Sequence, residues 1–268
     1  MRSIGLQPRV NYDALNLGYQ LVNDFCKTKL SSKKITFFTT GTVAETFPEL
    51  LKEISNDGHE ISCHYHYHDL MFKQSNNEID KNLELAKEAI FKACGYAPKG
   101  FRAPVFSIPK ERVDIFKVIE KHFEYDSSYV LYLNKFSKED YFKQHPFTLD
   151  KLKEFPIVPK PFLNKKISIK SGGTFLRLYT KEMMKEVMLF NHQEGFIPLV
   201  YMHPYDYLVN KEFWVPLSDF MKSKKIANIL KYPRQLQWTG LRNKTVFPKL
   251  EYLLEFFEHQ GPMSELLN

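Results

Sequence analysis

Three histidines stand at alternate positions in the stretch His64-Tyr65-His66-Tyr67-His68. Imidazole nitrogens bind divalent metal ions, and zinc is the ion most typical of such sites. If the stretch is extended, all three side chains point the same way, and His66 is then an alternative ligand. If it curls into a helical turn, His64 and His68 meet as residues i and i+4. In either case two imidazoles, those of His64 and His68, are expected to reach one metal ion.

The elements around this stretch determine where the histidines lie. Residues 56–58 (Asn-Asp-Gly) end a helix, and residues 59–63 read as a short strand, so the histidines follow a strand end. Capping boxes are expected at Thr42/Glu45 and Ser75/Glu78, and Gly95 ends the second helix. The segments 35–40 and 197–202 are expected to be strands, and 101–106 a short strand that runs into a loop. Residues 125–130 are a strand or a loop, and 155–158 are a candidate strand. The remaining helices are 12–25, 110–122, 180–194 and one near 245–259, the last capped by Thr245. This alternation predicts an α/β fold with a parallel sheet.

Two further polar residues follow other expected strands. Arg102 lies in the 101–106 segment, and His203 follows the 197–202 segment. An arginine can orient and stabilise a carboxylate, and a histidine can give a proton to a leaving group. In a barrel all the strand ends open on one face, so we expect Arg102, His203 and the His64/His68 pair to share one pocket.

Composition bounds the class of protein. The 268 residues are 43% hydrophobic and 26% charged with a net charge of +7, which is ordinary for a globular chain. The lysines are scattered, so a nucleic-acid partner is not expected. The three cysteines form no C-x-x-C pair, and no signal peptide or membrane span is evident, so we expect a cytoplasmic protein. We expect one domain over residues 1–268, with a C-terminal helical extension from about residue 211.

Taken together, several motifs resemble the polysaccharide deacetylase (NodB-homology) family, in the subgroup associated with surface-polysaccharide synthesis. The matching stretches, in chain order, are Thr36-Phe37-Phe38…Gly41, Gly58-His59-Glu60-Ile61…His64-x-x-x-His68, Gly100-Phe101-Arg102-Ala103-Pro104-x-Phe106-Ser107-Ile108, Tyr125-Asp126-Ser127-Ser128, Gly172-Gly173-x-Phe175-Leu176-Arg177-Leu178, Tyr201-Met202-His203-Pro204 and Gly261-Pro262-Met263.

The resemblance implies a distorted (β/α) barrel that removes acetyl groups from N-acetylated sugars. It also implies a divalent metal, most often zinc, held by one aspartate and two histidines, here His64 and His68. Arg102 matches the arginine that pairs with the base carboxylate, and His203 matches the general acid. Asp126 matches the acidic residue that supports this acid. Val105 would offer its backbone N–H to the oxyanion.

The sequence departs from the family at its beginning. The family opens with a strand that ends in the metal-binding aspartate and the catalytic base, whereas no Asp precedes Asp13, inside the first expected helix. We therefore expect the third ligand, the base and the first barrel strand to be missing, through truncation, a misassigned start or lost activity. The expected reaction is de-N-acetylation in capsule or O-antigen synthesis, with impaired activity. The alternative is a non-catalytic relative that binds a glycan or a partner in the same groove.

Overall fold

The computed structural model describes residues 11–133, 151–163, 167–222 and 232–267. These residues form two compact units. Unit 1 comprises the described parts of residues 1–32, 170–190 and 198–259, and unit 2 those of residues 33–169, 191–197 and 260–268. The expectation of a single domain with an extension from about residue 211 stays a prediction.

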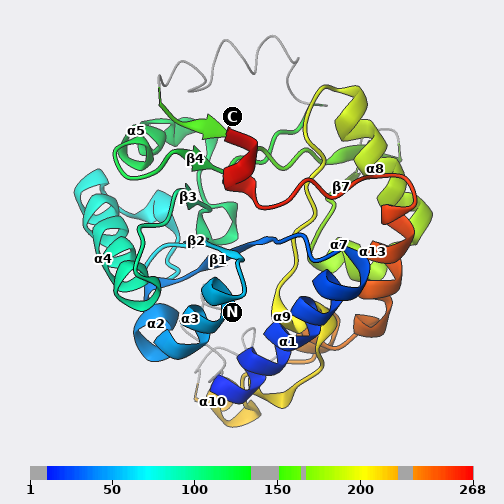
Figure 1. The fold of residues 1–268 in the computed structure, drawn as a ribbon, viewed down its shortest axis with the longest axis horizontal. Helices are drawn as coiled ribbons and strands as arrows, with labels where there is room; N and C mark the ends of the chain where they lie inside the picture. The colour runs from blue at the N-terminus through cyan, green and yellow to red at the C-terminus, as the bar shows by residue number, and fades with distance from the viewer. Residues whose placement is uncertain (1–10, 134–150, 164–166, 223–231, 268) are drawn as a thin grey trace. The chain divides into compact units, whose positions relative to one another are not determined.

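Unit 2 is built on a parallel sheet whose five strands follow chain order (Figure 1). The strands are β1 (Thr36–Thr39), β2 (Glu60–Cys63), β3 (Gly100–Phe101), β4 (Tyr125–Asp126) and β5 (Lys153–Glu154). Every neighbouring pair is parallel, which confirms the predicted α/β class. Among the described residues no hydrogen-bonded ladder joins β5 to β1, so backbone pairing does not close a barrel in this part of the chain.

Four helices connect these strands and lie along one side of the sheet in Figure 1: α2 (Gly41–Thr46), α3 (Pro48–Asn56), α4 (Asn76–Cys94) and α5 (Asp114–Glu120). The longest, α4, begins with the predicted Ser75/Glu78 capping box and ends at Gly95, whose φ of 82° is left-handed. Its stripe Ile79, Leu83, Ala86 and Ile90 is buried. This packing fixes the carboxyl ends of β2 and β3 at one edge of the unit.

Several elements begin or end at residues other than the predicted ones. Helix α2 is capped by Thr40, whose hydroxyl accepts from the Val43 N–H, so the predicted Thr42/Glu45 capping box is wrong. The expected strand 101–106 ends at Phe101 because a 3-10 turn follows at Pro104–Phe106. The expected strand 155–158 is replaced by the earlier β5, with a single bridge from Ile157 to Val130.

Two smaller elements complete unit 2. Strands β6 (Lys160–Phe162) and β7 (Ile167–Ile169) form an antiparallel pair. The final 3-10 helix η7 (Met263–Leu267, red in Figure 1) returns to the first strands of the sheet. There the Ser264 N–H donates to the Glu60 carboxylate at 3.1 Å, and the Met263 N–H donates to the Thr36 hydroxyl at 2.8 Å. Unit 2 also contains the 3-10 turns η2 (Met71–Lys73) and η4 (Lys110–Arg112), whereas η5 (Lys211–Phe213) and η6 (Asn243–Thr245) belong to unit 1.

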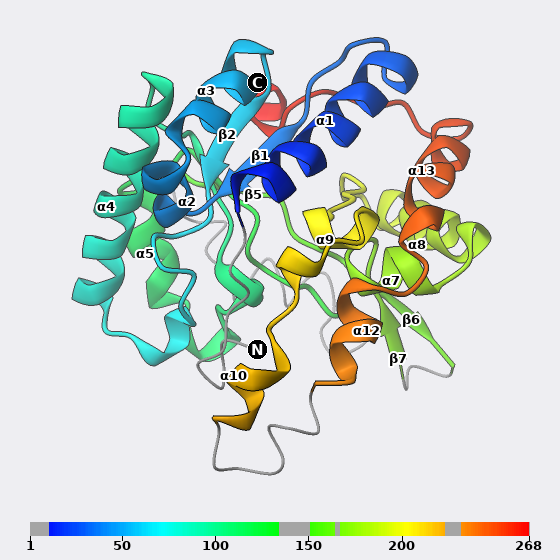
Figure 2. The ribbon, with the colours of Figure 1, turned by 90° about the horizontal axis from the view of Figure 1, so that it is seen from below.

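Unit 1 is helical where it is described. Its helices are α1 (Tyr12–Lys29), α7 (Thr174–Leu178), the larger part of α8 (Lys181–Gln193), α9 (Pro204–Tyr207), α10 (Leu217–Met221), α12 (Arg234–Thr239) and α13 (Val246–Leu254). Helix α9 packs on α1, α12 and α13 (Figure 2). None of the helices in the described residues is long and apolar enough to cross a membrane.

Two predictions for this part of the chain fail. The apolar segment 197–202 makes only one bridge, Tyr201 to Gly172, rather than a strand. Gly172 is required there, because a Cβ at this position would lie 2.3 Å from the Tyr201 carbonyl oxygen. The last helix ends at Leu254 instead of 259, and Thr245 makes no side-chain cap. Its hydroxyl donates instead to the carbonyl oxygens of Arg242 and Arg177.

Candidate active site

The histidine stretch lies at the carboxyl end of β2. The His64 N–H donates to the Thr39 carbonyl at 2.6 Å, which continues the β1–β2 pairing by one residue. Tyr65 and His68 then take left-handed φ values of 71° and 61°, so the stretch is neither extended nor a regular helical turn. The tight path still brings the His64 and His68 rings together, with centroids 4.9 Å apart and planes at 73°.

The surroundings of His64 suit a metal ligand. Its Nδ1 lies 2.6 Å from the Arg102 carbonyl oxygen. A carbonyl can only accept, so Nδ1 carries the proton and Nε2 carries the lone pair, as in many metal-binding histidines. The pair therefore fits two positions of a zinc site. Within the described part of the chain, no three His, Cys, Asp or Glu side chains gather as a metal site, so these residues do not complete the coordination.

His66 does not complete the pair in this structure. Its side chain is 3% exposed and lies beside Gly41 at the start of α2, where a Cβ would come within 2.2 Å of the ring Nδ1. The ring Nε2 lies 3.8 Å from the Glu45 carboxylate. The left-handed turn at Tyr65 removes the extended geometry on which the His66 alternative depended. His66 is thus packed against a helix and belongs to no three-ligand group among the described residues.

Arg102 follows β3 and turns back over the sheet. Its Nε donates to the Ser127 carbonyl at 3.2 Å, and its Nη2 donates to the Ser127 hydroxyl at 2.8 Å. The guanidinium carbon lies 4.3 Å from the centroid of the Phe38 ring, a cation–π arrangement. Ser127, the residue after β4, and the Phe38 ring of β1 therefore fix the position of the Arg102 charge.

Val105 stands in a strained turn beside Arg102. Its φ and ψ of 57° and 19° are left-handed, and Phe106 follows with a φ of 53°. A β-branched residue in this region is a true outlier, and such strain costs about 1–3 kcal/mol. The Val105 side chain is 67% exposed, so its burial does not offset the strain. Strained backbone of this kind gathers at functional sites, in keeping with the predicted oxyanion role of the Val105 N–H.

Asp126 lies at the end of β4, completely buried. Its Oδ1 accepts from the Ser128 hydroxyl at 2.6 Å, and its Oδ2 accepts from the Ser128 N–H at 3.0 Å. Across the β4–β5 ladder its register partner is Glu154. Burial raises the pKa of Asp126, and burial together with the Asp126 charge raises the pKa of Glu154 well above its usual range. The neighbours of Asp126 are thus two neutral donors, the hydroxyl and the N–H of Ser128, and a second acid, Glu154.

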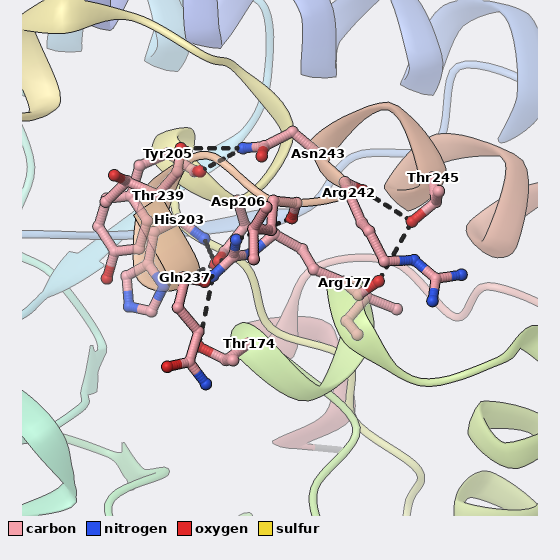
Figure 3. Close-up of polar contacts among 12 residues, drawn as sticks. Thr174, Arg177, His203, Tyr205, Asp206, Gln237, Thr239, Arg242, Asn243 and Thr245 are labelled. Atoms are coloured by element: carbon pink, nitrogen blue, oxygen red, sulfur yellow. Dashed lines mark hydrogen bonds and ion pairs between the residues drawn. The ribbon is translucent and has the colours of Figure 1, made fainter. Parts of the chain in front are cut away.

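His203 lies in unit 1 at the start of α9 (Figure 3). It contacts Asp206, and Asp206 in turn contacts Arg177. Its Nδ1 lies 2.9 Å from Asp206 Oδ2, and the His203 N–H donates to the same oxygen at 2.8 Å. The Nε of Arg177 donates to Asp206 Oδ1 at 2.9 Å. Arg177 and Asp206 are buried, whereas the His203 side chain is 42% exposed. The carboxylate thus fixes one ring nitrogen and leaves an edge of the ring accessible.

The Arg177 guanidinium is itself held by the backbone of the later helices. Nη1 donates to the Leu241 carbonyl and Nη2 to the Gln237 carbonyl, both at 3.0 Å. The Tyr205 ring stacks on His203 with centroids 4.7 Å apart and planes at 9°. Sequence reasoning missed Asp206 and assigned the support of His203 to Asp126. The signal was present, because an acid three residues after a helix-capping position is placed to bond back to it.

The predicted residues thus fall in two groups. His64, His68, Arg102, Val105 and Asp126 belong to unit 2, and His203 belongs to unit 1. Within unit 2, His64 is linked to Arg102 through its carbonyl, and β3 to β4 by strand pairing. The expected convergence of Arg102 and His203 in one pocket stays a prediction.

Comparisons with known proteins agree with the family resemblance. The family model for polysaccharide deacetylase matches residues 29–121. Over 78 residues the chain is 37% identical to a peptidoglycan-N-acetylglucosamine deacetylase of Bacillus cereus, which covers 29% of this chain and 28% of that protein. Over 119 residues it is 30% identical to a peptidoglycan deacetylase of Helicobacter pylori, which covers 40% of this chain and 39% of that protein. The chain thus spans well under half the length of these curated relatives.

Solved structures show the same fold over nearly the whole chain. A candidate polysaccharide deacetylase from Mycobacterium smegmatis superposes with a TM-score of 0.57 at 18% identity, covering 96% of this chain and 77% of that one. A CE4 family pseudoenzyme from Bacillus anthracis superposes with a TM-score of 0.51 at 14% identity, covering 94% and 61%. At such identities the likeness concerns the fold alone. Residues 29–121 are thus similar to the polysaccharide deacetylase family, and the likeness over the rest of the chain is one of fold.

Proposed function

We propose that the protein removes N-acetyl groups from a glycan, with His203 as the general acid. The observation that carries this proposal is the arrangement Arg177–Asp206–His203. A buried carboxylate, matched by a buried arginine, holds Nδ1 of an accessible histidine. The other ring nitrogen is then the one that can give a proton to the sugar nitrogen as the amide breaks. The relatives named for peptidoglycan deacetylation favour an N-acetylated hexosamine polymer as the substrate class.

The other residues of the proposed site stabilise charge. The Val105 N–H donates to the oxygen of the tetrahedral intermediate, and the Arg102 guanidinium supplies a fixed positive charge held by Ser127. Such preorganised donors cost no reorganisation during the reaction. A divalent ion, most readily zinc, held by His64 and His68 and by a further ligand, would supply polarisation of the acetyl carbonyl. Among the residues before β1, the acids Asp13 and Asp24 lie on α1, so we assign the catalytic base to neither.

Metal binding is tested without activity. Dialysed wild-type protein should retain zinc or a similar divalent ion, weakly, because two imidazoles form only part of a site. The variant with His64→Ala and His68→Ala should lose this metal in elemental analysis. A control variant with His122→Ala removes a histidine paired with Asp80 on the helices, and it should retain the metal. Equal metal content in the double variant and the wild type would refute the assignment.

Activity is tested by acetate release from chitooligosaccharides in the presence of zinc or cobalt. General acid catalysis contributes about 10²–10⁴-fold, so His203→Ala should lower kcat by that factor. We expect slow release by the wild type, because the described residues supply neither a base nor a third metal ligand. Brisk, metal-dependent release would show that a base and a ligand come from residues not assigned here. Release that is equal in wild type and His203→Ala would reject the role of His203.

A specific observation also favours a second function, that of a non-catalytic glycan-binding relative. The observation in its favour is that, in the part of the chain that the structure describes, no third metal ligand joins His64 and His68. Structures of the same fold include one named a pseudoenzyme and a mutant of it named for restored enzymatic activity. This alternative predicts that chitooligosaccharides bind in calorimetry while no acetate is released at any zinc concentration. Its setting, as for the enzyme, would be surface-polysaccharide synthesis in the cytoplasm.

A further inference from the structure

Two serines after Asp126 contact the turn that carries Arg102 and Val105. The Ser128 hydroxyl accepts from the Ala103 N–H at 2.7 Å and donates to Asp126 at 2.6 Å. The Ser127 hydroxyl accepts from Arg102 at 2.8 Å and donates to the Phe155 carbonyl at 2.7 Å. Both serines are completely buried.

The direction of these hydrogen bonds is fixed by chemistry. A serine hydroxyl has one proton and two lone pairs. The Ser128 hydroxyl donates to the Asp126 carboxylate, and the Ser127 hydroxyl donates to the Phe155 carbonyl. Ser128 must therefore accept from the Ala103 N–H, and Ser127 must accept from Arg102. Asp126 therefore acts on the turn through Ser128, rather than through a contact of its own.

The turn needs such a restraint. Val105 and Phe106 are consecutive non-glycine residues with φ of 57° and 53°. Positive φ is sterically unfavourable for residues that carry a Cβ, so this conformation must be held by other contacts. The exposed side chain of Val105 provides no packing that would hold it. The bond from Ala103 to Ser128 is a buried anchor placed two residues before Val105. Loss of that anchor should let the turn relax toward right-handed or extended conformations.

We propose that Ser127 and Ser128 are positioning residues, with Asp126 orienting Ser128, and that together they keep the Val105 N–H and the Arg102 guanidinium in the geometry that stabilises the oxyanion. This inference rests on the proposed deacetylase function. It also gives Asp126 a role different from the support of His203. Because the oxyanion exists only after attack, the two serines should affect kcat and leave KM almost unchanged.

The test compares Ser128→Ala with Ser62→Ala. Ser62 is a completely buried serine on the neighbouring part of the same sheet, and its hydroxyl contacts Glu60 and Tyr125 instead of the turn. Removing an oxyanion donor costs about 10²–10³-fold in kcat, and we expect Ser128→Ala to lose about 10-fold or more of acetate release because the donor is displaced rather than deleted. Ser62→Ala should keep kcat within about 2-fold, since it touches no group placed at the oxyanion.

A second variant separates positioning from a general loss of stability. Glycine adopts a φ near +57° without strain, so Val105→Gly added to Ser128→Ala should restore part of the lost kcat. A purely structural role for Ser128 predicts no such rescue. Equal kcat losses in Ser128→Ala and Ser62→Ala, or no gain from Val105→Gly, would overturn the proposal.

Amide hydrogen exchange of residues 103–106 provides a readout independent of turnover. Exchange in this segment should accelerate in Ser128→Ala and remain at the wild-type rate in Ser62→Ala. If the wild type releases no acetate, the proposed function fails, while the exchange comparison still decides whether the serines hold the turn. Unchanged exchange in Ser128→Ala would refute the restraint itself.

Discussion

Asp126 and Asp206 are both completely buried aspartates, yet they have opposite kinds of neighbour. Asp206 lies between the Arg177 guanidinium and the His203 ring. Asp126 lies between the hydroxyl and N–H of Ser128 and the carboxyl group of Glu154. The Arg102 charge acts in the opposite direction to burial and lowers the pKa of Asp126, as the smallest of the named causes. One carboxylate is thus part of an ion pair, and the other organises a turn.

The difference shows that burial alone does not reveal what a carboxylate does. A buried charge needs a matched partner, which Arg177 provides for Asp206. Asp126 instead satisfies its oxygens with neutral donors, and it shares its site with an acid whose pKa is raised well above the usual range. Only the first arrangement orients a histidine for proton transfer.

Replacing each aspartate by asparagine should give the largest difference in the free energy of unfolding. Asp206→Asn leaves the Arg177 charge buried without a counter-charge, and breaking a buried pair in this way costs about 3–5 kcal/mol. Asp126→Asn keeps one of the two oxygens that accept from Ser128 and leaves no buried cation without its ion-pair partner, so the cost should be about 1 kcal/mol. Urea unfolding followed by circular dichroism measures both free energies. Equal losses would show that the two buried sites do not differ as their partners indicate.

Glu154→Gln tests the acid beside Asp126 through the pH dependence of the melting temperature. The folded-state pKa of Glu154 is raised above 4.5, so the wild type gains stability from the retained proton at low pH and loses it as pH rises from about 4.5 toward the folded pKa. The neutral glutamine avoids this loss. Relative to the wild type, Glu154→Gln should therefore melt at the same or a lower temperature at pH 4 and at a higher temperature at pH 7. A difference in melting temperature that does not change with pH would contradict the shared acid site.

His203→Gln should have the smallest effect on stability. The side chain is partly exposed, and Asp206 remains bonded to Arg177 without it, so the loss should be below about 1 kcal/mol. The same variant should lower acetate release as strongly as His203→Ala. A loss of stability comparable to that of Asp206→Asn would mean that the histidine, and not the arginine, holds the buried carboxylate.

The sequence predicted the parts of the fold that depend on local chemistry. The Ser75/Glu78 capping box and the end of that helix at Gly95 are both confirmed. The parallel sheet followed from the alternation of strands and helices, and it is confirmed as well. The meeting of His64 and His68 was also predicted, although the left-handed conformations of Tyr65 and of His68 itself were not.

The parts that failed depend on partners far apart in the chain. The apolar segment 197–202 lacks a ladder because Gly172 offers it only one bridge. The match of Asp126 to His203, made by motif order, stays a prediction; within unit 2 the neighbours of Asp126 are Ser128 and Glu154. Arg177 was quoted only as part of a motif, because its acceptors at residues 237 and 241 lie some sixty positions further on. Side-chain pairing at such separations leaves no periodic signal.

The return of segment 263–264 to the first strands has a consequence for the synthesis of the protein. The Glu60 carboxylate accepts from Thr36, from Tyr125 and, 204 positions later in the chain, from the Ser264 N–H. On the ribosome β1 and β2 emerge long before Ser264, so the Glu60 carboxylate lacks this hydrogen bond until residue 264 has emerged. Unit 2 should therefore become resistant to proteases only after residues 263–264 leave the ribosome, and chains stalled before that point should be degraded preferentially.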